Sequence, residues 1–210
     1  MTALTETQLM VVATAEALAQ RFGPEYWREH DENEAYPEAF INALCESGFF
    51  GVTVPEALGG SGQGLSDLVL VMEALCRGGG GGGPALGYLF GLLGTMTLVH
   101  AAESEHQQDE LKALAAGERL CAFALSEPDA GTNSFNISTT AIEREDDFII
   151  NGAKWFITNL QHSQRLLLVT QTQRAGSTES CGLSLFLVNL PNEALTFTPT
   201  PKHGFNYYKS

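Results

Sequence analysis

The stretch Phe123-Ala-Leu-Ser-Glu-Pro-Asp-Ala-Gly-Thr-Asn133 marks the point where the character of the sequence changes. Before it, apolar residues recur at helical spacing. After it, short runs of β-branched and aromatic residues alternate with turns. The stretch begins inside a strand candidate and continues directly into a polar turn, Ser126 to Asn133. It therefore predicts a junction between a helical part and a β part of the chain.

Helices are predicted throughout the first part of the chain. Thr5 is a suitable N-cap for the first helix, and Ser104 with Gln107 resembles a capping box for the last. Between them, Pro84 opens a long apolar helix. The expected helices cover residues 5–19, 37–46, 67–76, 84–102 and 105–116.

Three segments between these helices are predicted to be irregular. Tyr26 to Tyr36 is polar and aromatic and is expected to be a connection, and Phe49 to Pro55 is expected to be extended. Gly78 to Gly83 is a run of six glycines, and a run of that kind has too much conformational freedom to hold one conformation cheaply. It therefore predicts a mobile connection between two helices.

The second part of the chain predicts strands joined by turns. Glu145-Asp-Asp147 and Asn151-Gly152 are typical of hairpins. We therefore predict an α+β fold with an all-helical domain, residues 1–117, followed by a small antiparallel β-barrel-like or β-sandwich domain, residues 118–210. The strand candidates are Leu120–Leu125, Ser138–Glu143, Phe148–Ile150, Lys154–Thr158, Arg165–Thr170, Leu183–Val188 and Leu195–Thr198.

Composition excludes several classes of function. The 210 residues include 25 acidic and 11 basic side chains, a formal net charge of −14, so no general attraction for nucleic acid or anionic membranes is expected. We expect no membrane span, no signal peptide at Met1 to Glu6, and a cytoplasmic location. The four cysteines are isolated and form no CxxC pair, so no metal site is predicted.

A second polar and aromatic stretch, Asn151-Gly-Ala-Lys-Trp-Phe-Ile-Thr-Asn159, follows the first. In a strand, Lys154, Phe156 and Thr158 would share one face, and Trp155 and Ile157 the other. An aromatic ring beside a hydroxyl suits a flat ligand with a polar edge. The first stretch suits a phosphate or a planar heterocycle held by N–H and hydroxyl donors. Taken singly, the first stretch is better explained as a capped turn, and the second is also consistent with an ordinary amphipathic strand.

Taken together and in this order, the two stretches resemble the two flavin-binding signatures of the acyl-CoA dehydrogenase family. Gly51-Val-Thr-Val-Pro-Glu-Ala-Leu-Gly-Gly-Ser-Gly62 and the segment from His106 to Glu118 are also similar to that family. The resemblance implies FAD as cofactor, an acyl-CoA thioester as substrate, α,β-dehydrogenation in fatty acid metabolism, and an electron-transfer flavoprotein as partner. It also implies a homo- or hetero-oligomer.

The resemblance implies particular contacts. The strand ending at Ser126 would line the isoalloxazine ring, and Leu125 and Ser126 would bond its pyrimidine edge. Thr132 would approach the pyrophosphate and also contact the pantetheine arm of the substrate. Phe156 would pack on the flavin, and Thr158 would bond near N5, where hydride arrives. The residues expected at the cofactor are Phe123, Leu125, Ser126, Gly131, Thr132, Phe156, Ile157 and Thr158.

Three positions depart mildly from the family pattern. Ser126 replaces a threonine, Thr132-Asn133 replaces Ser-Asp, and Phe156 replaces a tryptophan. A larger departure is length, because family members are nearly twice as long and carry their catalytic glutamate in a C-terminal helical domain. No residue here is therefore assigned as catalytic base, and Glu127 is interpreted as structural.

Alternative functions remain open at this stage. The chain is also consistent with a catalytically incomplete subunit or truncated remnant of such an enzyme. A third possibility is another flavoprotein of the same fold, of the nitroalkane oxidase or flavin monooxygenase type. Basic residues of the second part offer a patch for the phosphates of CoA, if they lie together: Lys154, Arg165, Arg174 and Lys202.

Overall fold

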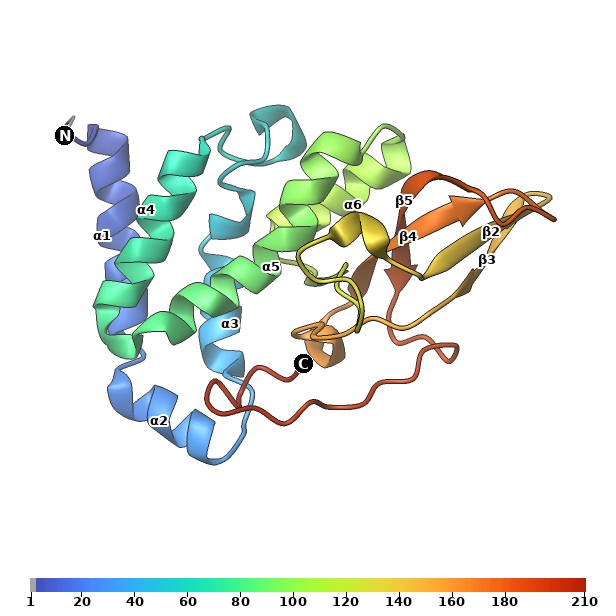
Figure 1. Cartoon of the computed structure of the whole chain (residues 1–210). Helices are drawn as coiled ribbons and strands as arrows, with labels where there is room; N and C mark the ends of the chain where they lie inside the picture. Colours follow the sequence, from blue (N-terminus) through green and yellow to red (C-terminus); the bar gives the residue numbers. More distant parts are fainter. Residues whose placement is uncertain (1–2) are drawn as a thin grey trace. The chain divides into compact units, whose positions relative to one another are not determined.

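The computed structural model describes residues 3–210 and divides them into two compact units (Figure 1). The helical unit contains the chain up to Leu120 together with Pro201–Tyr208. The β unit contains Cys121–Thr200 together with Lys209–Ser210. A helical part followed by a sheet confirms the predicted α+β class.

Capping side chains set the start of the outer helices. Thr5 Oγ1 accepts a hydrogen bond of 3.2 Å from the Gln8 amide, and Ser104 Oγ accepts one of 3.3 Å from the Gln107 amide. The amides of Thr5 and Ser104 in turn donate to the side-chain oxygens of Gln8 and Gln107, which completes a capping box at each helix start, as the sequence predicts for Ser104. The α-helices are α1 (Glu6–Gln20), α2 (Pro24–Glu32), α3 (Glu38–Glu46), α4 (Leu65–Leu75), α5 (Gly82–Ala101) and α6 (Glu105–Ala115).

Two irregular segments expected from the sequence are helical instead. Pro24 occupies the first turn of α2, where a missing N–H costs nothing, and Trp27 is buried with its Nε1 donating to the Phe22 carbonyl at 2.9 Å. The burial of Trp27 is what stabilises a helix in so polar a segment. Phe49–Gly51 forms a 3-10 turn rather than an extended run, because Gly48 turns the chain at φ 74°.

The glycine run is a packed element, not the mobile connection that the sequence predicts. Cys76–Gly80 continues α4 as a π-helical turn. A Cβ on Gly78 would lie 2.2 Å from the Cβ of Ala19 in α1, and one on Gly80 would lie 2.2 Å from Nε1 of Trp27. The absence of side chains therefore lets this turn contact α1 and α2 directly.

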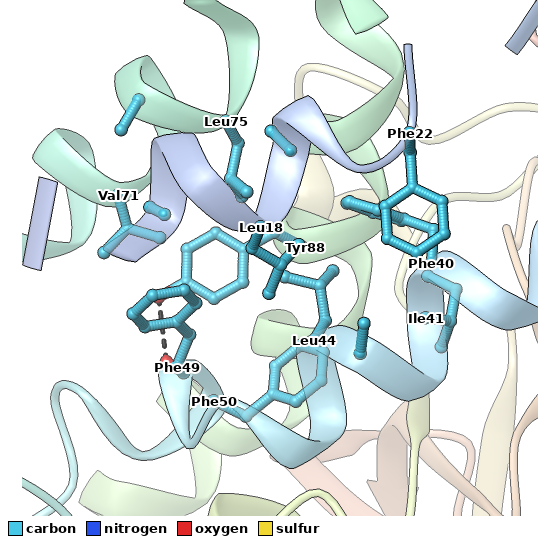
Figure 2. Packing of buried hydrophobic residues seen from close by; sticks show 14 of the residues in the cluster. Leu18, Phe22, Phe40, Ile41, Leu44, Phe49, Phe50, Val71, Leu75 and Tyr88 are labelled. Atoms are coloured by element: carbon cyan, nitrogen blue, oxygen red, sulfur yellow. Dashed lines mark hydrogen bonds between the residues drawn. The ribbon is translucent and has the colours of Figure 1, made fainter. Parts of the chain in front are cut away.

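The core of the helical unit draws side chains from all of the helices α1 to α5. Figure 2 shows Leu18, Leu44, Phe50 and Tyr88 gathered in one cluster, in which the Tyr88 hydroxyl donates to the Phe49 carbonyl at 2.8 Å. By length and composition α5 could cross a membrane, but 56% of its apolar window is buried within the protein. The buried central helix of a water-soluble protein can be equally long and apolar, so the length and composition of α5 are weak evidence for a membrane span.

The sheet of the β unit is mixed, which corrects the predicted antiparallel arrangement. Its central strand, β4 (Arg165–Gln173), pairs antiparallel with β5 (Ser180–Asn189) on one edge. On the other edge it pairs in parallel with β1 (Cys121–Ala124) and then with β2 (Thr140–Arg144). The hairpin partner of β2 is β3 (Asp147–Asn151). Strands β1 and β2 lie one after the other along the same edge of β4, and both run in its direction.

The chain between β1 and β2 loops away from that edge, and this loop is the polar turn identified in the sequence. Glu145 lies in the turn of the predicted β2–β3 hairpin. Asn151-Gly152 does not form a second hairpin, because the chain leaves the sheet there, and the predicted strands Lys154–Thr158 and Leu195–Thr198 are irregular.

Candidate functional site

Backbone and side-chain bonds hold the two signature-like stretches side by side. The amide of Trp155 donates to the carbonyl of Ser126 at 2.8 Å. Nζ of Lys154 donates to the carbonyl of Leu125 at 3.1 Å. Two neighbouring residues of the second stretch therefore bind two neighbouring residues of the first, within a single compact unit.

A buried ion pair reinforces this junction. Nζ of Lys154 lies 2.7 Å from Oε1 of Glu127, and the side chains are 8% and 2% exposed. The Glu127 carboxylate also accepts bonds from the Ser138 amide at 2.5 Å, the Ser138 hydroxyl at 2.7 Å and the Thr139 amide at 3.0 Å. It thus joins three chain segments, in agreement with its structural interpretation.

The bonds around Glu127 keep it charged. Burial alone raises the pKa of this carboxyl, but the hydrogen bonds from Lys154, Thr139 and Ser138 outweigh burial and lower the pKa to about 2. Burial lowers the pKa of Lys154, and the hydrogen bond and charge of Glu127 oppose that effect. Lys154 is therefore committed to the ion pair and does not contribute to a surface patch for phosphates.

An exposed aromatic pair follows Lys154. The rings of Trp155 and Phe156 are stacked, with centroids 5.1 Å apart and planes at 14°, and the residues are 43% and 62% exposed. Strand alternation would place the two rings on opposite faces. Phe156 instead adopts φ 60°, a left-handed conformation that brings its ring onto that of Trp155. The pair forms a flat apolar surface open to solvent.

The loop after Ser126 leaves room for close approach to its backbone. Glu127 and Ala130 exchange backbone hydrogen bonds of 3.1 and 3.2 Å, which close a tight turn. Gly131 and Thr132 follow this turn and are exposed. A Cβ added to Gly131 would meet no atom within 4 Å. The loop therefore offers a ligand the accessible backbone at Gly131 and the exposed side chain of Thr132.

The structure distributes the other predicted site residues over both faces of the sheet. Phe123 and Leu125 pack on one face with Ala130, Ile137 and Val169. Ile157 is buried in the core of the other face, so its side chain is not open to a cofactor. The Thr158 hydroxyl lies 2.9 Å from the Ser210 hydroxyl and is already hydrogen-bonded.

A hollow of about 480 Å³ within the β unit adjoins the aromatic pair. Trp155 and Phe156 line it together with Leu168, Phe197 and Ser210. Across residues 3–210, no group of three or more His, Cys, Asp or Glu side chains is arranged to hold a metal ion.

The residues at this site fit a flavin nucleotide. A planar tricyclic ring needs a flat apolar surface, which Trp155 and Phe156 provide, and polar donors near its edge, which Ser126 provides. A pyrophosphate needs open backbone and hydroxyl donors, which Gly131 and Thr132 provide.

Two residues at this junction have roles that the strand pattern does not assign. A strand at Lys154–Thr158 would put Lys154 on one face and Trp155 on the other, away from Phe156. The structure instead pairs Lys154 with Glu127 and stacks Trp155 on Phe156. The signal for the pair is a lysine among apolar and aromatic residues, because a charge that becomes buried needs a partner. No local signal predicts the positive φ of Phe156, since phenylalanine rarely adopts it.

Comparison with known proteins places the chain in a family. The sequence model of the N-terminal domain of acyl-CoA dehydrogenase matches residues 5–118, and that of the middle domain matches residues 122–210. A 3-(aryl)acrylate reductase of Clostridium sporogenes is 33% identical over 84% of this chain and 46% of the relative. The caffeyl-CoA reductase-Etf complex subunit CarC of Acetobacterium woodii is 32% identical over 80% of this chain and 44% of the relative.

Solved structures agree with these matches. The FAD complex of PigA superposes with a TM-score of 0.84 at 25% identity, over 96% of this chain and 53% of that protein. The chain thus spans about half the length of the relatives that it matches. Because the two domain models together match nearly all of its residues, the chain belongs to the acyl-CoA dehydrogenase family.

Proposed function

We propose that this chain forms the helical and flavin-binding parts of an FAD-dependent enzyme that dehydrogenates an acyl-CoA thioester between its α and β carbons. The observation that carries the proposal is the junction of the two stretches, where the Trp155 amide bonds the Ser126 carbonyl beside an exposed aromatic pair. When bound, FAD would accept the hydride equivalent that leaves the substrate's β-carbon.

The chain's own residues would bind and orient the cofactor. Phe156 and Trp155 would contact the ring and exclude water from one side of it. The hydroxyl of Ser126 would bond the polar edge of the ring, and the backbone at Gly131 with the hydroxyl of Thr132 would bind the pyrophosphate. Thr132 would also contact the pantetheine arm of the substrate.

The names of two relatives support two parts of the proposal: that the reaction occurs between the α and β carbons, and that an electron-transfer flavoprotein is the partner. The names of the two curated relatives describe reductases of an acrylate and of caffeyl-CoA. Reduction of such a double bond is the reverse of α,β-dehydrogenation. CarC is named as a subunit of a complex with Etf, which supports an electron-transfer flavoprotein as partner of this chain.

The catalytic base is proposed to lie outside these 210 residues. Glu127, the buried carboxylate beside the aromatic pair, is held as a charged partner of Lys154 and accepts bonds on both oxygens. A group with its pKa lowered to about 2 is poorly suited to remove a proton near neutral pH. This observation favours a second candidate function, a subunit that becomes catalytic only with a partner chain.

A visible absorption spectrum tests both candidates. The purified chain is titrated with FAD and then, without oxygen, with a panel of acyl-CoA thioesters. Saturable binding of FAD followed by bleaching with an acyl-CoA supports the dehydrogenase. FAD that binds but bleaches only after a partner chain is added supports the incomplete subunit, and bleaching only by a nitroalkane supports an oxidase of the same fold. A chain that binds no FAD, alone or with partners, contradicts the proposal.

A further inference from the structure

We propose that Lys154 is a positioning residue. It holds the stacked rings of Trp155 and Phe156 next to the loop Leu125–Glu127, in the position where they would contact the flavin ring. This inference rests on the proposed function for the identity of the ligand. It concerns a residue that does not itself touch the cofactor, because its side chain is 8% exposed.

The rings need an external constraint. Phe156 has a left-handed backbone conformation, which is disfavoured for a residue with a Cβ. Its ring is 62% exposed, so its own burial contributes little to hold it there. The conformation persists only if neighbouring residues fix the backbone on either side.

Lys154 supplies that constraint on the N-terminal side of the pair. Its Nζ is bound by two oxygens from different residues, the Leu125 carbonyl at 3.1 Å and Glu127 Oε1 at 2.7 Å. The amide of the next residue, Trp155, is bound to the Ser126 carbonyl at 2.8 Å. Three consecutive residues of the loop are therefore hydrogen-bonded to the two consecutive residues that precede Phe156.

Glu127 transmits the constraint to the rest of the sheet. Its carboxylate binds the amides of Ser138 and Thr139, which immediately precede β2. Loss of the lysine would leave this buried carboxylate without its counter-charge, and the loop would rearrange to reach water. The position of the rings is therefore coupled to the ion pair and not only to the local chain.

The test compares three variants of the full chain. Lys154→Met keeps an unbranched apolar stem and removes the charge. Glu127→Gln combined with Lys154→Met removes both charges, so no buried charge is left unpaired and we expect this variant to fold. The matched control is Arg119→Met, which breaks a 2.5 Å ion pair with Glu110 in the helical unit, where the side chains are 38% and 7% exposed.

The first readout uses the protein without FAD. Trp155 is 43% exposed and Trp27 is 5% exposed, so iodide quenching of tryptophan fluorescence reports mainly on Trp155. We expect a changed quenching constant and emission maximum in both Lys154 variants and none in Arg119→Met. Unchanged fluorescence in a folded Lys154→Met variant would overturn the proposal.

The second readout uses FAD. We expect the dissociation constant of FAD to rise about tenfold in both Lys154 variants. A rise of that size corresponds to the loss of about one hydrogen bond. We also expect the visible circular dichroism of the bound flavin to change, which a loss of stability alone would not produce. Wild-type affinity and an unchanged flavin spectrum in both Lys154 variants would contradict the inference.

The two readouts separate this inference from the proposed function. If the wild-type chain binds no FAD, the proposed function fails, whereas the fluorescence comparison still decides whether Lys154 positions the rings. If neither Lys154 variant folds, hydrogen exchange on the wild-type chain decides, because the Trp155 amide should be protected by its bond to Ser126. Fast exchange at Trp155 would overturn the proposal.

Discussion

Gly78 lies so close to Ala19 that a Cβ on the glycine would sit 2.2 Å from the alanine Cβ. The contact joins the π-helical turn after α4 to the last turns of α1, and Ala19 is fully buried there. Two carbon atoms cannot approach so closely, so the two helices can keep this spacing only with glycine at position 78.

The first prediction concerns this contact. Gly78→Ala should lower the free energy of unfolding by about 1–3 kcal/mol, because the helices must separate to admit the methyl group. The matched control is Gly82→Ala, whose Cβ would come no closer than 3.5 Å to Phe205, an ordinary contact. Urea unfolding measures both variants, and an equal effect at the two positions would contradict the packing argument.

The second prediction concerns pH. The folded-state pKa of Glu127 is lowered from 4.5 to about 2, so the carboxylate's contribution to stability is complete above about pH 4.5. It is lost as pH falls towards 2, and amounts to about 3 kcal/mol. In urea unfolding at several pH values, Glu127→Gln should therefore be least stable relative to wild type near pH 7. The two proteins should converge towards pH 2.

An exposed carboxyl provides the control for that pH profile. Glu143 lies in β2 and is exposed to solvent. Glu143→Gln should follow the wild-type profile across the whole range. A Glu127→Gln profile that runs parallel to wild type down to pH 2 would show that this carboxyl does not carry the pH dependence.

The third prediction separates binding from stability at Phe156. Phe156→Gly relieves the left-handed conformation and removes a ring that is 62% exposed, so stability should stay within about 1 kcal/mol of wild type. The affinity for FAD should fall at least about tenfold, because the ring surface is lost. Thermal unfolding and FAD titration measure the two effects.

The control for Phe156 is another left-handed residue. Glu145, at φ 55° in the hairpin turn, is exposed and does not line the hollow beside the ring pair. Glu145→Gly should be as stable as wild type or more so, with unchanged FAD affinity. Equal FAD affinity in Phe156→Gly and Glu145→Gly would remove Phe156 from the cofactor site.

The fourth prediction uses Trp155 as a reporter. If the flavin ring approaches the stacked pair, FAD should quench the fluorescence of the exposed Trp155 by direct contact. In Trp155→Phe, the remaining emission comes from the buried Trp27, and the FAD-dependent quenching should be much smaller. Quenching that is the same with and without Trp155 would place the flavin elsewhere.

The sequence by itself determined the features that depend on neighbouring residues. Helix starts at Thr5 and Ser104 follow from side chains three residues from their partners, and the change from helix to strand follows from the spacing of apolar residues. The two signature-like stretches could be read in the same way, because each is continuous. These are local properties, so a linear sequence contains them in full.

Only the tertiary structure decided the features that depend on distant partners. Helix α2 forms because the side chain of Trp27 is buried, and the glycine run is packed because Ala19 and Trp27 lie directly against it. Lys154 becomes a structural cation because Glu127, 27 residues earlier, lies 2.7 Å from its Nζ within the β unit. The left-handed turn at Phe156 is disfavoured locally, and we infer that it exists because that distant contact fixes the chain beside it.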